Sequence, residues 1–142
     1  MDRAKALGAD HLVNYRAEPE WGRTVRALTD GMGADHVVEV GGAGTLAQSI
    51  RAVRGGGTIS LIGVLGGASA EVGLGHVVTQ NIRLQGVTVG SRDTFEDMLR
   101  AIALHRMRPV IDDRVYAFHE VAEAIRRLPD GGHVGKVGVA FP

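Results

Sequence analysis

The chain has 142 residues, with 16 Lys and Arg against 16 Asp and Glu, so its formal net charge at neutral pH is zero. This length suits one domain, and the composition, 44% hydrophobic and 23% charged, is typical of a globular protein. The neutral balance argues against a nucleic-acid-binding face, and no apolar run reaches the roughly 18 residues of a membrane span. The absence of cysteine excludes disulfides and a thiolate nucleophile. The first residues do not resemble a signal peptide, and we expect a cytoplasmic location.

Helical and extended patterns alternate in the first part of the chain. We expect helices over residues 2–7, 18–29 and 45–53, and strands over residues 12–15, 36–40 and 58–64. The segment Gly8-Ala9-Asp10-His11-Leu12-Val13 returns as Gly33-Ala34-Asp35-His36-Val37-Val38. Two copies are too few for a solenoid, so we interpret the echo as one helix-to-strand turn used twice, with glycine capping the helix.

The second part of the chain begins with a looser stretch and continues with longer elements. We expect a strand over residues 82–89, at the edge of the sheet, and then a helix whose capping box is Asp93-Thr94-Phe95-Glu96. Its apolar stripe comprises Phe95, Met98, Leu99 and Ile102. After Pro109 we expect an extended segment over residues 110–118, a helix over residues 119–128 and a last strand over residues 134–141.

Strands that alternate with short helices indicate βαβ units and a parallel sheet. The fold class is therefore α/β, a doubly wound parallel sheet, and right-handed crossovers should place helices on both of its faces. The extended segment, helix and strand at the C-terminal end need not belong to that sheet.

Glycines follow three of the expected strands, at the sheet edge where open α/β folds bind their ligands. The three segments are Gly41-Gly42, Gly63-Val64-Leu65-Gly66-Gly67 and Gly90-Ser91-Arg92. Glycine lets backbone amides approach a ligand closely, but it serves short turns equally well, and both interpretations stay open here. Arg92 and Lys136 lie beside glycines, where a cation would meet a phosphate or would simply be solvated.

Other chemistry finds little support in the sequence. The six histidines show neither an H-x-x-E-H pattern nor an i, i+4 pair, so we predict no metal site. Asp112 and Asp113 are adjacent in an extended segment and point to opposite sides, which suits general acid and base catalysis poorly. No serine has a G-x-S-x-G context, so we predict no catalytic residue. The G-x-G-x-x-G dinucleotide motif is also missing.

The order of four segments resembles the C-terminal part of medium-chain dehydrogenases, the family of zinc-type alcohol dehydrogenases and quinone oxidoreductases. These segments are Ala6 to Tyr15, Val37-Val38-Glu39-Val40-Gly41-Gly42, Gly56 to Gly63, and Gly135-Lys136-Val137-Gly138-Val139. The resemblance implies strands 3 to 6 of a Rossmann-like cofactor domain over residues 1–108. It also implies that residues 109–142 form a tail returning to the catalytic domain.

By this resemblance the chain contacts NAD or NADP, with the choice between the two left open. Tyr15 matches a position near the adenosine ribose, and Gly41 and Gly42 lie along the cofactor. Further cofactor-binding positions implied by the family are Gly63, Val64 and Thr88 near the nicotinamide, Lys136 near the pyrophosphate, and Arg92 at the end of the last sheet strand.

The family's catalytic domain, its zinc ligands and strands 1 and 2 with their glycine-rich phosphate cradle are not in this sequence. We therefore expect no zinc in this chain and no activity of the chain by itself. Strand 12–15 lacks its neighbour and must pair elsewhere, swap or fray. The resemblance also implies a homodimer through the 82–89 edge strand.

Three hypotheses on function follow. The first is part of an NAD(P)-dependent oxidoreductase that, when complete, transfers hydride to or from an alcohol, carbonyl or quinone. The second is a non-catalytic fragment that only self-associates or binds nucleotide weakly. The third is an unrelated small α/β ligand-binding module.

Overall fold

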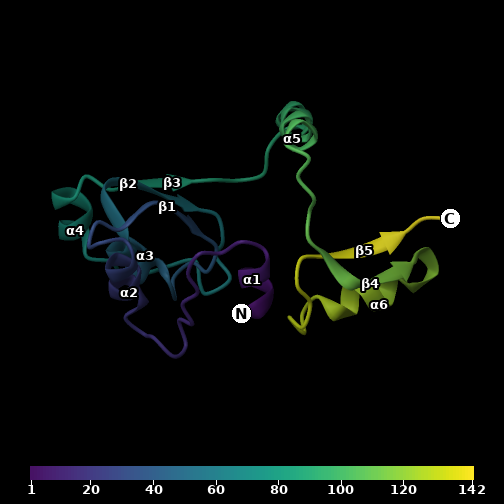
Figure 1. Cartoon of the computed structure of the whole chain (residues 1–142), viewed down its shortest axis with the longest axis horizontal. Helices are drawn as coiled ribbons and strands as arrows, with labels where there is room; N and C mark the ends of the chain where they lie inside the picture. The colour runs from purple at the N-terminus through teal and green to yellow at the C-terminus, as the bar shows by residue number, and fades with distance from the viewer. The chain divides into compact units, whose positions relative to one another are not determined.

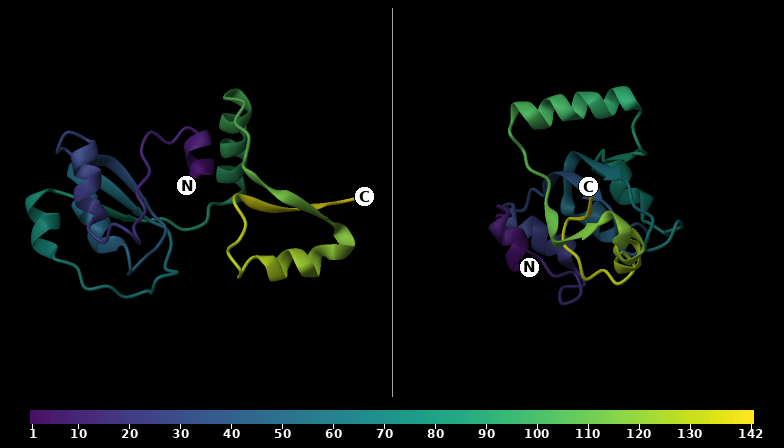
Figure 2. Two further views of the ribbon diagram at one scale, coloured as in Figure 1. Left: turned by 60° about the horizontal axis from the view of Figure 1, so that its bottom comes forward. Right: turned by 90° about the vertical axis from the view of Figure 1, so that its right-hand side faces the viewer.

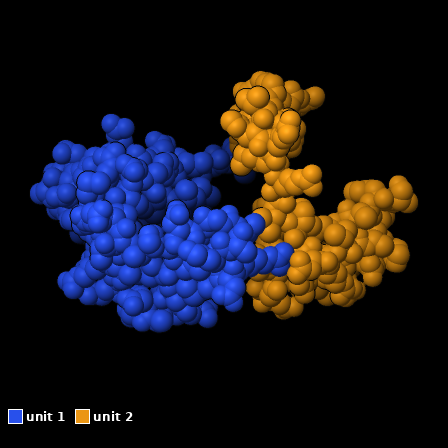
Figure 3. Space-filling model, viewed as in Figure 1, with its two compact units in different colours: residues 1–89 blue, residues 90–142 orange.

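The computed structural model describes all residues, 1–142, and divides the chain into two compact units, residues 1–89 and 90–142 (Figure 3). The boundary expected from the family, between residues 108 and 109, concerns the plan of a complete dehydrogenase and stays a prediction. No helix is long and apolar enough to cross a membrane.

The first unit is built on a parallel sheet of three strands in the order β1-β2-β3 (Figure 1). The strands are β1 (Ala34–Glu39), β2 (Val53–Leu61) and β3 (Arg83–Gly86), and the helices are α1 (Asp2–Ala6), α2 (Trp21–Leu28), α3 (Leu46–Ala52) and α4 (Leu74–Thr79). Register pairs Glu39 with Leu61, and Leu61 with Gly86, so the carboxyl ends of all three strands meet at one edge. The α/β class with parallel strands is confirmed.

One face of this sheet carries the core. Ile50 of α3 packs with Val53 and Ile59 of β2 and with Ile82, and Val77 of α4 joins the same cluster. Helices α2 and α3 lie side by side on this face (Figures 1 and 2). The opposite face carries Val38, which is 63% exposed.

Helices on both faces were expected, and for the first unit this is wrong. The chain visits β1, β2 and β3 in one direction, so crossovers of one hand place α3 and α4 on the same face. Helices reach the second face only where the strand order reverses, and no reversal occurs within these three strands.

The strand expected at residues 12–15 is also not formed, because these residues have no ladder partner. Residues 11–14 are irregular and Tyr15 begins a turn. A strand is not stable without a neighbouring strand that forms hydrogen bonds with its backbone N–H and C=O groups. The repeated turn survives this loss, because Gly8 and Gly33 both adopt positive φ, +98° and +94°, which favours glycine.

Several elements differ in extent from the sequence prediction. Strand β2 starts at Val53 and runs through Gly55-Gly56-Gly57 to Leu61, whereas the sequence predicted a helix up to residue 53 and a strand only over residues 58–64. The looser stretch contains α4, and β3 ends at Gly86 rather than Val89.

The second unit contains α5 (Arg92–Leu104), β4 (Ile111–Ala117), the 3-10 turn η1 (Phe118–Glu120), α6 (Val121–Arg127) and β5 (Lys136–Ala140). Strands β4 and β5 form a separate parallel pair on which α6 packs, burying Tyr116 and Ala124. Asp112 ties these parts together, since its carboxylate accepts hydrogen bonds from Arg127 of α6 and from the backbone amide of Val134. The C-terminal segments thus form a sheet of their own.

Helix α5 begins differently from the expected capping box. Ser91 is the N-cap residue, and its hydroxyl accepts a hydrogen bond of 3.3 Å from the Thr94 amide. Glu96 instead pairs with Arg92 at 2.7 Å. The N-cap therefore lies two residues before the predicted one, because Ser91 has the extended conformation that an N-cap requires.

Candidate functional site

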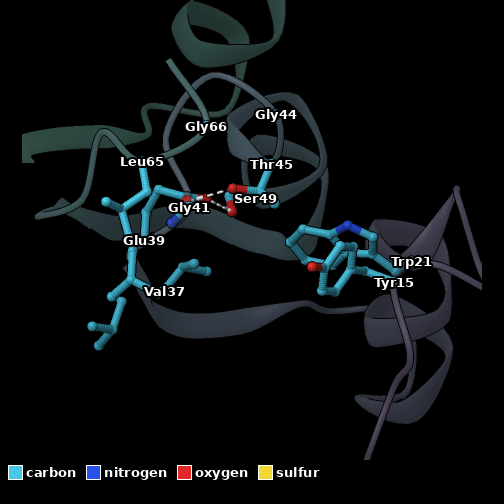
Figure 4. A pocket seen from close by; sticks show the side chains of 12 residues that line it. Tyr15, Trp21, Val37, Glu39, Gly41, Gly44, Thr45, Ser49, Leu65 and Gly66 are labelled. Atoms are coloured by element: carbon cyan, nitrogen blue, oxygen red, sulfur yellow. Dashed lines mark hydrogen bonds between the residues drawn. The ribbon is translucent and has the colours of Figure 1, made fainter. Parts of the chain in front are cut away.

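A cleft of about 780 Å³ lies at the carboxyl end of β1. Its walls come from the start of α2 and the turn before it, from β1, from the β1–α3 turn and α3, and from the loop after β2. The lining residues are Tyr15, Trp21, Val37, Val38, Glu39, Val40, Gly41, Gly44, Thr45, Ser49, Leu65 and Gly66. Figure 4 shows the two aromatic rings at one side of the cleft and a cluster of oxygen atoms around Glu39 at the other. A volume of this size is typical of small-molecule and cofactor sites.

The carboxylate of Glu39 organises the polar side of this cleft. It is only 3% exposed, and its Oε1 atom accepts hydrogen bonds from the amides of Gly41 (2.8 Å) and Gly42 (3.0 Å). The Thr45 hydroxyl donates to Oε1 at 2.5 Å, and the Ser49 hydroxyl donates to Oε2. Thr45 and Ser49 are four residues apart, so they share one face of the first turns of α3. Four donors thus hold the carboxylate and fix the β1–α3 turn.

The electrostatics of Glu39 follow from these contacts. Burial acts to raise the pKa of the carboxyl group, because it disfavours the charged form. The hydrogen bonds from Ser49, Thr45, Gly42 and Gly41 act in the other direction, and the net result is a pKa below the ordinary value of 4.5. Glu39 is therefore ionised at neutral pH although it is buried.

The glycines after β1 and β2 bring backbone against backbone. A Cβ at Gly42 would lie 3.0 Å from the carbonyl oxygens of Gly63 and Gly67, and one at Gly63 would overlap the carbonyl oxygen of Val40. The Gly66 amide donates to the Gly41 carbonyl at 2.7 Å. These contacts favour a structural role of the glycines over direct ligand contact. The glycines permit the close approach of two loops, and the amides of Gly41 and Gly42 already donate to Glu39.

The residues predicted to bind cofactor fall into four places. Tyr15 and Gly41 line the cleft, and Gly42, Gly63 and Val64 line a neighbouring hollow of about 290 Å³. Thr88 follows β3 and is exposed. Arg92 begins α5 and Lys136 begins β5, both in the second unit, where the Lys136 amide donates to the Val110 carbonyl at 2.8 Å. The cofactor-binding roles of all eight residues stay predictions.

Sequence reasoning missed Glu39, Thr45, Ser49, Trp21 and Leu65 as parts of this site. One signal was available for the first three. A glutamate that ends an apolar strand, followed by two hydroxyl residues at helical spacing, indicates a buried carboxylate with local donors. Trp21 and Leu65 carry no such signal, since only folding brings them to the cleft.

The cleft fits some parts of a nicotinamide dinucleotide and not others. Its apolar and aromatic walls and its polar cluster suit a ring and its sugar. The pyrophosphate is different, because no Lys or Arg lines the cleft and the Gly41 and Gly42 amides are engaged by Glu39. No group of three or more His, Cys, Asp or Glu residues is placed to hold a metal ion.

The sequence matches the family description "Zinc-binding dehydrogenase" over residues 1–103. It is 36% identical over 141 residues to a zinc-type alcohol dehydrogenase-like protein of Schizosaccharomyces pombe, a match that covers 96% of this chain and 40% of that protein.

Solved structures show the same similarity. A protein described as an alcohol dehydrogenase from Sinorhizobium meliloti 1021 is 44% identical, with a TM-score of 0.87. A structure described as an NAD-dependent alcohol dehydrogenase is 34% identical, with a TM-score of 0.81. In both cases the match covers 99% of this chain and 40% of the other. The chain thus spans about 40% of the length of the relatives it matches.

Proposed function

The chain belongs to the zinc-binding dehydrogenase family, in which it corresponds to the C-terminal part of the cofactor domain, and we propose that it forms part of an oxidoreductase dependent on NAD or NADP. The complete enzyme would transfer hydride to or from an alcohol, carbonyl or quinone. When bound, the nicotinamide ring supplies that hydride chemistry. We expect the chain to supply no catalytic residue for this reaction and to be inactive by itself.

The observation that supports a cofactor role most directly is the cleft at the carboxyl end of β1. Parallel sheets bind ligands at this edge, and here the edge is hollowed, apolar and flanked by aromatic rings. The chain's own residues would bind a ring and a sugar between Tyr15, Trp21 and Leu65 and would hold them away from water. Cations for the phosphates must come from outside the cleft, and Arg92 and Lys136 remain the candidates that the resemblance implies.

A fluorescence titration tests this proposal, because Trp21 is the only tryptophan and lines the cleft. NADH or NADPH should quench its emission with saturation in the micromolar to millimolar range. Leu65→Asp should weaken this binding about fivefold or more, because a carboxylate at the cleft repels the anionic dinucleotide. Leu65 is 96% exposed, so the substitution should leave folding intact.

Met32→Asp is the matched control, since Met32 is also exposed, at 69%, in the turn before β1 of the same unit and does not line the cleft. Its affinity for the dinucleotide should equal that of the wild type. No saturable quenching by either cofactor at several millimolar, or equal weakening in both variants, would refute the proposal.

Self-association is the second candidate, and the edge strand β3 favours it. All four residues of β3 are exposed, and only the β2 side of the strand is paired. We propose a homodimer through residues 82–89, and this proposal does not depend on whether the complete protein is catalytically active. Light scattering should give twice the chain mass, and Leu84→Lys should halve it. A monomeric mass for the wild type would exclude this dimer. The cytoplasmic location stays a prediction.

A further inference from the structure

The polar side of the cleft has an unusual hydrogen-bonding character. The Glu39 carboxylate accepts hydrogen bonds from two backbone amides and two hydroxyl groups, three of them at Oε1 and the fourth, from Ser49, at Oε2. Glu39 is ionised, since its pKa lies below the ordinary value, so it has no proton to donate. The carboxylate therefore only accepts hydrogen bonds.

The hydroxyl groups of Thr45 and Ser49 can likewise only accept hydrogen bonds from a ligand. Each has one hydrogen, and the Ser49 hydrogen is committed to Glu39. Thr45 has a second acceptor within range, the Gly42 carbonyl, but this lies at 3.4 Å against 2.5 Å for the Glu39 carboxylate, and it too would consume the hydrogen. In either case only the lone pairs of the Thr45 and Ser49 oxygens are left for a ligand.

Accessibility favours Thr45 over Ser49 as the residue that contacts a ligand. Ser49 is 1% exposed, whereas Thr45 is half-buried, and both belong to the cleft lining. No cationic side chain lines the cleft, so an anionic ligand group would meet a buried negative charge and oxygen lone pairs without compensation.

We propose that the Glu39–Thr45–Ser49 cluster makes this part of the cleft a selective subsite for a hydrogen-bond donor, an amide or amino N–H of an uncharged ring, and that it disfavours phosphate. The inference rests on the proposed function, that the cleft holds part of a nicotinamide dinucleotide. Such a dinucleotide carries the required group twice, as the amino group of its adenine and as the carboxamide of its nicotinamide.

Pairs of small probes identify which group the subsite takes. The first pair is adenosine and inosine, in which an oxygen acceptor replaces the amino donor. The second pair is nicotinamide and 3-acetylpyridine, in which a methyl group replaces the amide nitrogen. Binding to the full chain is followed by ¹⁵N NMR through the amides of Gly41 and Gly44 and the indole N–H of Trp21. Inorganic pyrophosphate is the anionic probe.

In one of the two pairs the donor-bearing member should bind about tenfold more tightly, because an acceptor-only site leaves the analogue's group unpaired. Pyrophosphate should move none of the cleft signals. Equal affinities within both pairs, tighter binding of inosine or pyrophosphate, or no binding of any probe at its solubility limit would overturn the proposal.

Substitutions at Thr45 separate recognition from structure. Thr45→Val removes the accepting oxygen at nearly constant shape, so it should abolish the preference within the pair while leaving the affinity for the analogue unchanged. Thr45→Ser keeps the oxygen and should keep the preference. A purely structural role would weaken both members of the pair equally. If Thr45→Val does not fold, the affinity ratios of the wild type and of Thr45→Ser still decide.

The outcome is distinguishable from failure of the proposed function. Quenching by NADH without discrimination within the probe pairs would overturn the donor-selective subsite and leave the cofactor role intact. Discrimination within a pair without NADH binding would overturn the cofactor role and leave the subsite intact.

Discussion

Glu39→Gln is the substitution that probes the candidate site most sharply. It keeps the size of the side chain and removes its negative charge. The amide oxygen of glutamine can take the place of Oε1, which accepts from Gly41, Gly42 and Thr45. The amide nitrogen then faces the Ser49 hydroxyl, which must reverse from donor to acceptor.

The expected cost follows from four hydrogen bonds that lose their ionic partner. Hydrogen bonds to charged groups contribute about 1.5–3 kcal/mol, against about 0.5–1.5 kcal/mol for neutral pairs. The four bonds belong to one network and are not additive, so we expect a loss of about 2–4 kcal/mol in the free energy of unfolding. That is a large share of the roughly 5–15 kcal/mol that stabilises a typical domain.

Urea denaturation monitored by Trp21 fluorescence measures this loss, because the only tryptophan lies in the same unit as Glu39. Glu71→Gln is the matched control at an exposed loop position, and it should change the free energy of unfolding by less than about 0.5 kcal/mol. The reasoning is refuted if Glu39→Gln is as stable as this control.

The pH dependence of the same loss provides a second test. The pKa of Glu39 is lowered in the folded state, so the ionised carboxylate stabilises the fold above its unfolded-state pKa, near 4.5. This contribution declines as the pH falls below 4.5 and through the folded-state pKa. The stability difference between wild type and Glu39→Gln should therefore be constant above about pH 5.5 and narrow in acid. A difference that widens in acid would contradict the assigned charge state.

Two further substitutions test local features. Gly63→Ala should destabilise the first unit by about 3 kcal/mol, because the new Cβ would overlap the Val40 carbonyl oxygen. Gly86→Ala is the control and should be tolerated, because nothing lies within 4 Å of a Cβ at that position. Urea denaturation compares the two variants, and equal stabilities would exclude the close approach at Gly63. Ser91→Ala should remove the N-cap of α5 at a cost of about 1 kcal/mol in the free energy of unfolding. It should also lower the helical circular dichroism signal more than Asp93→Ala does. A larger loss of helical signal in Asp93→Ala would favour the capping box expected from the sequence.

The elements that sequence predicted well are those whose signals are local. The stripe from Phe95 to Ile102 lies within α5, and the apolar run at residues 58–61 lies within β2, because periodicity follows from the geometry of each element alone. The residues from Leu12 to Tyr15 have a strand pattern too, yet they are irregular. A strand forms only with a partner, and no local signal reports whether the partner is present.

The candidate site divides in the same way. The sheet edge after β1 and the glycines of its turn were predictable, because parallel strands end at one edge and their exits are short. Glu39 as the organiser was not inferred, although its chemistry is local. Leu65 and Trp21 were beyond sequence reasoning, since each reaches the cleft from a different element.

The sequence by itself determined the α/β class, the family and the edge of the sheet at which a ligand would bind, because periodicity, motif order and strand direction are carried along the chain. Only the tertiary structure decided that the helices of the first unit cover one face, that the glycine turns pack on each other, and that four donors converge on Glu39. These features depend on which segments meet in space, and that choice minimises the free energy of the whole fold rather than of any segment.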